Sequence, residues 1–138
     1  MRHNPHRDHP TLLQLVQVRD ALLRLHKALL DGQRAKYERA NGRVGSPGEM
    51  LKLVIGNADF DWLHRLSELV VEIDEQVEDK QTVLTPENGQ VLIDQAKVLL
   101  TPDEGGAAVF GRKYYEALQE DPAAGAMHAE LRTLMKRQ

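Results

Sequence analysis

Three polar residues recur at intervals of seven between two apolar stripes of the segment 11–41: Arg19, His26 and Gln33. Seven residues make almost two turns of α-helix, so the three side chains fall along one line of a helix. Leucine and valine stripes lie on both sides of that line. Guanidinium and imidazole groups that enter a helical core can form a polar pocket for a small ligand or an anion.

A second segment, 59–80, carries complementary groups at the edge of its apolar face, Ser67 and Asp74. If the two helices pack antiparallel, Asp74 can reach Arg19 and Ser67 can reach His26. The candidate ligand-binding residues are therefore Arg19, His26, Tyr37, Ser67 and Asp74.

Two other interpretations of these residues stay open. A buried charge must be paired, so the same groups can form a structural network that fixes the register of two helices. The wide apolar arc of residues 11–41 can also lie in a homodimer interface, where arginine is favoured over lysine.

Metal chemistry is indicated weakly, and only at the start of the chain. A free amine, two backbone amides and His3 can form a square-planar nitrogen site that suits Cu(II) or Ni(II), with His6 and His9 as further ligands. We expect such binding to be adventitious, because residues 1–10 read as a polar, flexible tail.

Other metal and phosphate patterns are incomplete. A di-iron bundle needs Glu-x-x-His on two helices, and the nearest sequence is Asp61-x-x-His64 followed by Glu68. Because His64 and Glu68 fall towards solvent, we interpret them as a surface ion pair. Gly106-x-x-x-x-Gly111-Arg112-Lys113 lacks the preceding strand and the following Ser or Thr of a phosphate-binding loop.

Charge is distributed unevenly along the chain. Residues 1–43 carry nine Lys or Arg and four Asp or Glu, a net charge of +5, and the total of −3 leaves −8 for the remainder. Acidic residues concentrate in 59–79. Helices of opposite charge that pack on one another explain this asymmetry, and the pI near 6.1 with few aromatic residues argues against nucleic-acid binding.

Composition indicates a globular protein. The chain has 138 residues, 41% of them hydrophobic and 28% charged, and it contains no cysteine. The absence of cysteine excludes disulfides and fits a reducing cytoplasm. No apolar run approaches the roughly 20 residues of a membrane span, so we expect a soluble cytoplasmic protein without a membrane partner.

Helix starts are marked by proline after a capping residue. Ser46-Pro47, Thr85-Pro86, Thr101-Pro102 and Asp121-Pro122 all have this form, and Thr11 with Gln14 resembles a capping box. The periodicity between these starts predicts an all-α, single-domain bundle (residues 11–138) of five to six helices, the first about 45 Å long. The expected helices are 11–41, 47–55, 59–80, 86–100, 107–121 and 122–137.

Several stretches resemble a group of small, uncharacterised bacterial helical proteins. They are 25–31, 46–54, 60–70, 99–102 and 110–115, of which Phe60-Asp61-Trp62-Leu63-His64-Arg65-Leu66 is typical. The resemblance implies a bacterial source and a helical fold, and it implies no activity.

The sequence thus favours a non-enzymatic helical module that self-associates, as a dimer, or binds a partner protein. The alternative is a bundle that binds a metal or small ligand through the polar residues of its core. No catalytic residues are predicted, and no cofactor.

Overall fold

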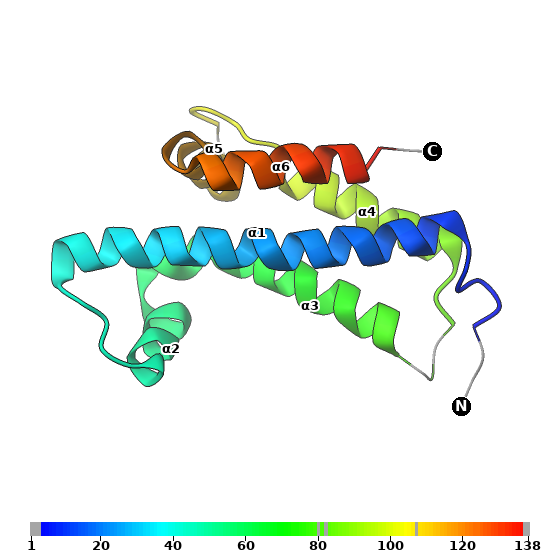
Figure 1. The fold of residues 1–138 in the computed structure, drawn as a ribbon, viewed down its shortest axis with the longest axis horizontal. Coiled ribbons are helices and arrows are strands. Elements are labelled where there is room, and N and C mark those ends of the chain that lie inside the picture. The colour runs from blue at the N-terminus through cyan, green and yellow to red at the C-terminus, as the bar shows by residue number, and fades with distance from the viewer. Residues whose placement is uncertain (1–3, 80, 82, 107, 137–138) are drawn as a thin grey trace.

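The computed structural model describes residues 4–79, 81, 83–106 and 108–136, and in these the regular structure is entirely helical (Figure 1). The elements are α1 (Pro10–Asn41), α2 (Pro47–Gly56), the 3₁₀-helix η1 (Ala58–Leu63), α3 (His64–Glu78), α4 (Pro86–Leu99), α5 (Val109–Glu120) and α6 (Pro122–Leu134). The predicted all-α bundle with a long first helix is confirmed. No helix in these ranges combines the length and the apolar character that crossing a membrane requires.

The first helix is the central element of the bundle. It packs against α3, α4, α6 and η1, and Figure 1 shows it running the full length of the molecule with the other helices around it. Leu15, Val18, Leu22 and Leu25 on α1 are fully buried. Their spacing of three and four residues places them on one face, which is the stripe expected from the sequence.

Three of the proline-marked helix starts are confirmed by their hydrogen bonds. Ser46 Oγ accepts from Glu49 N at 3.2 Å, Thr85 Oγ1 accepts from Asn88 N at 3.2 Å, and Asp121 Oδ1 accepts from Ala123 N at 3.0 Å. In each helix proline occupies the first turn, where its missing N–H leaves no partner unsatisfied.

Two predicted starts are wrong. Thr101-Pro102 begins no helix, because the Thr101 hydroxyl donates to Lys97 O at 2.8 Å and Gly105, with φ +70°, turns the chain before α5 begins at Val109. The first helix is capped by His9, whose Nδ1 accepts from Thr11 N at 3.1 Å, and not by a Thr11 capping box.

The predicted helix 59–80 is divided into η1 and α3. Asn57 starts η1, since its Oδ1 accepts from Asp59 N at 2.9 Å. The tighter 3₁₀ winding places Phe60 and Leu63, three residues apart, on one line, and both are buried, as is Trp62. The segment η1 therefore contributes two buried aromatic side chains, Phe60 and Trp62.

Aromatic rings connect η1 with the last two helices. Centroids of Trp62 and Phe110 lie 5.5 Å apart, those of Phe110 and Tyr114 5.4 Å, and those of Tyr114 and His128 5.4 Å. These contacts attach α5 and α6 to η1, and they lie in the usual range for stabilising aromatic pairs.

The second helix differs from the others because none of its residues is buried. It packs on η1, and Figure 1 shows it projecting beside the far end of α1. Half of its ten residues are large and apolar: Met50, Leu51, Leu53, Val54 and Ile55. A helix of this composition normally buries one face, so α2 leaves apolar surface exposed that such a helix would usually bury.

Two helical glycines should respond differently to alanine. A Cβ at Gly32 would meet nothing within 4 Å, whereas a Cβ at Gly89 would lie 3.0 Å from Leu12 Cδ2, where α4 approaches α1. Gly32→Ala should therefore raise the free energy of unfolding by about 0.5–1 kcal/mol through helix propensity alone. Gly89→Ala should gain less or lose stability. Urea unfolding of both variants measures this, and an equal gain at both positions would contradict the close approach at Gly89.

Candidate functional site

The three polar residues spaced by seven on α1 all bond to the antiparallel segment η1–α3. Arg19 contacts Asp74 and Glu78, His26 contacts Ser67, and Gln33 contacts Trp62. We call this set of seven residues the polar ladder. The contacts expected between Arg19 and Asp74 and between His26 and Ser67 are both present.

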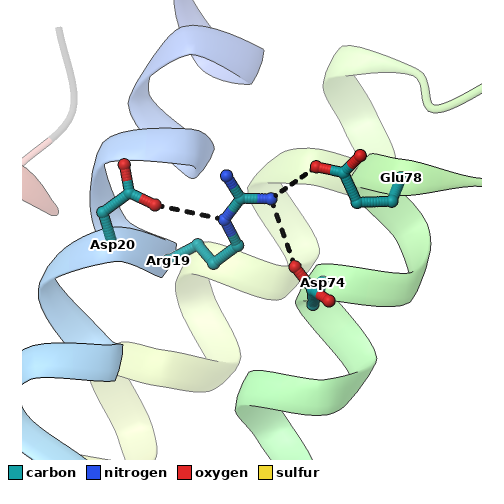
Figure 2. A network of polar contacts seen from close by, with 4 residues as sticks. All are labelled: Arg19, Asp20, Asp74 and Glu78. Atoms are coloured by element: carbon teal, nitrogen blue, oxygen red, sulfur yellow. Dashed lines mark hydrogen bonds and ion pairs between the residues drawn. The ribbon is translucent and has the colours of Figure 1, made fainter.

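The Arg19 end of the ladder is an ion-pair cluster (Figure 2). Arg19 Nη1 lies 2.9 Å from Glu78 Oε1 and 3.2 Å from Asp74 Oδ1, and Arg19 Nε lies 3.2 Å from Asp20 Oδ1. The arginine side chain is 15% exposed and the three carboxylates are more than half exposed. Burial opposes the charge of Arg19, but the carboxylates outweigh it and raise its pKa. The guanidinium is therefore held by protein groups already.

The middle rung joins two half-buried side chains. Ser67 Oγ and His26 Nε2 lie 2.9 Å apart. Burial lowers the pKa of His26, so the neutral imidazole is favoured in the folded protein. A neutral ring can either accept a hydrogen bond from the Ser67 hydroxyl or donate one to its oxygen. In both cases the hydroxyl and the ring nitrogen have a hydrogen-bond partner.

The third contact of the polar ladder joins Gln33 to the indole ring of Trp62. Trp62 Nε1 donates to Gln33 Oε1 at 3.0 Å, while the ring is only 8% exposed. A buried indole N–H without an acceptor would destabilise the fold by roughly 1–3 kcal/mol. The sequence had placed Gln33 on the ladder, but it gave no sign of the tryptophan as its partner.

Tyr37 lies apart from the ladder. It is 11 residues from His26, roughly 16 Å along the helix, and its ring packs 6.2 Å from Phe60. None of Arg19, His26, Tyr37, Ser67 and Asp74 lines any of the three described cavities. Their geometry therefore favours the interpretation as a register-fixing network, and ligand binding by these residues stays a prediction.

Two further buried polar contacts were missed from the sequence. Gln14 Nε2 donates to Leu134 O and to Lys136 O, both at 2.8 Å, which anchors the end of α6 to α1. Tyr114 Oη lies 2.8 Å from His128 Nδ1, and burial raises the pKa of Tyr114 while lowering that of His128. Gln14 interrupts the apolar stripe beside Leu15, and that interruption was the one available signal.

His64 is not the surface ion-pair partner that the sequence suggested. Its Nε2 lies 2.8 Å from Val54 O, so the ring ties the end of α2 to the start of α3. Among the described residues no group of three His, Cys, Asp or Glu is placed to hold a metal ion. His3 lies outside the described residues, and Cu(II) or Ni(II) binding by His3, His6 and His9 stays a prediction.

A cavity of about 330 Å³ opens beside Trp62, between α1, η1 and α5. Small residues create the space, among them Ala28, Gly32 and Ala117. Its charged lining residues are Lys36, Arg39, Asp59, Asp61, Lys113, Glu116, Glu120 and Asp121. The volume falls at the lower end of the range for small-molecule sites, and the acidic groups outnumber the basic ones.

A larger groove of about 1120 Å³ lies between α3, α4 and the start of α5. Its apolar lining residues are Leu69, Val91, Val98, Leu99, Ala108, Val109 and Phe110. Three of these are strongly exposed for valines: Val98 at 78%, Val109 at 53% and Val91 at 52%. We call this surface, with its rim, the α3–α4 groove.

The rim of the α3–α4 groove is mainly acidic. Glu68, Glu72, Asp94 and Asp103 line it, with Arg65 as the single cation. Asp94 accepts from Gln90 Nε2 at 2.9 Å. Glu68 and Glu72 form no ion pair with another described residue, in contrast to Asp74 and Glu78 on the same helix. Asp94 also pairs with Lys97 Nζ at 4.0 Å, so the uncompensated charge of the groove is that of Glu68 and Glu72.

Comparison of the chain with protein-family models, with curated proteins and with solved structures found no match in any of the three. The resemblance to small bacterial helical proteins stays a prediction.

Stability should depend on pH through the two half-buried histidines. Burial lowers the pKa of His26 and of His128, so the unfolded chain binds more protons than the folded protein once the pH falls below the ordinary value of 6.5. The free energy of unfolding is therefore not reduced by these histidines above pH 6.5. It falls as the pH decreases from 6.5 to the lowered pKa that each histidine has in the folded protein. Urea unfolding at pH 7.5 and pH 5 should show this loss, and His26→Gln should reduce it. An undiminished loss in both His26→Gln and His128→Gln would exclude the two histidines as its source.

Proposed function

We propose that this protein is a non-enzymatic helical module that binds a partner through the α3–α4 groove. The observation that carries the proposal is the convergence of three exposed valines, Val91, Val98 and Val109, on one acidic-rimmed hollow. Single exposed apolar residues are common on protein surfaces, but a contiguous apolar patch inside a polar rim is typical of an interaction site.

The chemistry of the groove selects the kind of partner. An amphipathic helix laid in a groove places its apolar residues at i, i+3, i+4 and i+7 on the floor. Val91 and Val98 are themselves seven residues apart on α4, so they provide a floor about 10 Å long. The free carboxylates of Glu68 and Glu72 favour a partner helix with lysine or arginine along its flanks.

The buried polar groups support a binding role in place of a catalytic one. The members of the polar ladder satisfy one another, and the described chain has no buried side-chain nitrogen or oxygen without a hydrogen bond. Such hydrogen-bonded networks make the helical bundle rigid, and its surface is then the part that can bind a partner.

The proposal is tested with a designed amphipathic peptide that carries leucines on one face and lysines on its flanks. Fluorescence anisotropy of the labelled peptide should show saturable binding that weakens as salt increases. Val98→Asp should weaken binding roughly tenfold or more, because it removes apolar contact and adds a buried carboxylate. Leu13→Asp is the matched control, since Leu13 is 51% exposed on α1 and lies outside the groove.

Two results would contradict this proposal. One is equal binding of a peptide with glutamates in place of the lysines, because the acidic rim should repel it. The other is equal weakening by Val98→Asp and Leu13→Asp, which would place the binding outside the α3–α4 groove.

A second candidate function is the binding of a small organic ligand in the cavity beside Trp62. The observation in its favour is a preformed space of about 330 Å³ lined in part by the largely buried Trp62. Acidic groups predominate in its lining, so an aromatic amine fits better than an aromatic acid.

Intrinsic fluorescence tests this second candidate, because Trp62 is the single tryptophan of the chain. Phenethylamine should change the emission of Trp62 saturably, and benzoate should have a weaker effect. Gly32→Leu should abolish the response, since the new side chain would occupy the cavity. An unchanged response in Gly32→Leu would show that the amine acts elsewhere.

A further inference from the structure

The structure contains a segment with the properties that the α3–α4 groove requires of its occupant. This segment is α2 with its preceding residues, 43–56, which we call the α2 arm. Leu51 is 59% exposed and Ile55 67% exposed, and their spacing of four residues places them on one face of the helix. The α2 arm therefore presents an apolar ridge to solvent.

The charges beside this ridge are basic. Lys52 adjoins Leu51, and Arg43 lies at the start of the arm; neither forms an ion pair with another described residue. The one acidic side chain of the arm, Glu49, is turned back, because its Oε2 accepts from Gly45 N at 2.9 Å. The arm thus combines an exposed apolar ridge with two cations, Lys52 on the helix and Arg43 ahead of it.

The dimensions of the two surfaces also agree. The ten residues of α2 span about 15 Å, and the valine floor of the groove is about 10 Å long. Leu51 and Ile55 are one turn apart, so both fit on that floor at once. The charge of Lys52 is opposite to the charges of Glu68 and Glu72, which line the groove.

The arm of one molecule cannot occupy its own groove in this fold. The His64 ring holds the end of α2 beside η1 through Val54 O, and no residue of α2 lines the groove. An occupant with the chemistry of the arm has to come from a second molecule.

We propose that the α2 arm of one copy binds in the α3–α4 groove of a second copy, so that the protein associates with itself. This inference rests on the proposed function and identifies the partner as another copy of the same chain. If two molecules exchange arms, the result is a closed two-fold dimer, which is the most common form of soluble assembly. If each arm binds the next molecule, the result is a chain that grows with concentration.

The test uses two variants that break opposite sides of the contact. Leu51→Asp damages the arm and leaves the groove intact, whereas Val98→Asp damages the groove and leaves the arm intact. Sedimentation velocity should show concentration-dependent association of the unmodified protein and a weakening of roughly tenfold or more in either variant alone. Leu13→Asp should associate like the unmodified protein.

Mixing provides the decisive measurement. An equimolar mixture of Leu51→Asp and Val98→Asp molecules retains one intact arm and one intact groove, so it should form a heterodimer at concentrations where each variant by itself is monomeric. Ile55→Asp with Val109→Asp is a second pair, used if circular dichroism shows that a member of the first pair is unfolded.

Two results would overturn the inference. One is a protein that stays monomeric at several hundred micromolar, and the other is a mixture that stays monomeric although the unmodified protein associates. Binding of the lysine-flanked peptide separates the two proposals. If the peptide binds the groove while the protein stays monomeric, the proposed function stands, and a second copy of the chain is excluded as the partner. If the peptide also fails to bind, the proposed function is wrong.

Discussion

The arrangement of this bundle depends on the polar ladder between α1 and the η1–α3 segment. Apolar side chains alone permit two helices to slide past one another, because leucine and valine stripes pack in several registers. The imidazole of His26 and the amide of Gln33 each need a particular partner, and a shift by one turn would separate them from Ser67 and Trp62. Arg19 adds an ion pair to the same face through Asp74 and Glu78. The ladder therefore gives the contact one register.

That register determines which faces of α3 stay open. With Asp74 and Glu78 directed at Arg19, Glu68, Leu69 and Glu72 line the α3–α4 groove. Acidic residues of the segment 59–79 therefore lie in different surroundings. Asp74 and Glu78 neutralise a cation of α1, whereas Glu68 and Glu72 line the α3–α4 groove without an ion pair to another described residue. Other cations of α1 are matched by later helices, Arg24 by Glu130 and Lys36 by Glu120.

Much of the fold was accessible from the sequence because its signals are local. Serine, threonine or aspartate followed by proline marked three helix starts, and the spacing of leucines identified the buried face of α1. The same local pattern failed at Thr101. Its hydroxyl can either cap a following helix or donate back to Lys97 O, and in the structure it donates to Lys97 O.

The candidate site was accessible only in part, because its contacts are not local. The pairing of Arg19 with Asp74 and of His26 with Ser67 followed from two assumptions, a common helical face and an antiparallel neighbour. The bond from Trp62 to Gln33 was not predicted, because the sequence indicated one continuous helix over 59–80 and Trp62 lies in the 3₁₀-helix η1. The groove could not be foreseen either, since it results from how far apart α3, α4 and α5 lie once each has packed on the core.

The exposed apolar surface of α2 is the part of the structure that internal packing leaves unexplained. Every other helix buries at least two residues, whereas α2 buries none and is nevertheless rich in large apolar side chains. Its position is well determined, because Ser46 caps its start and His64 contacts its last turn. A helix that is fixed in place with its apolar ridge in water exposes surface whose burial would be favourable. Together with the acidic groove, this makes association through the two surfaces the arrangement that would bury what the single molecule leaves open.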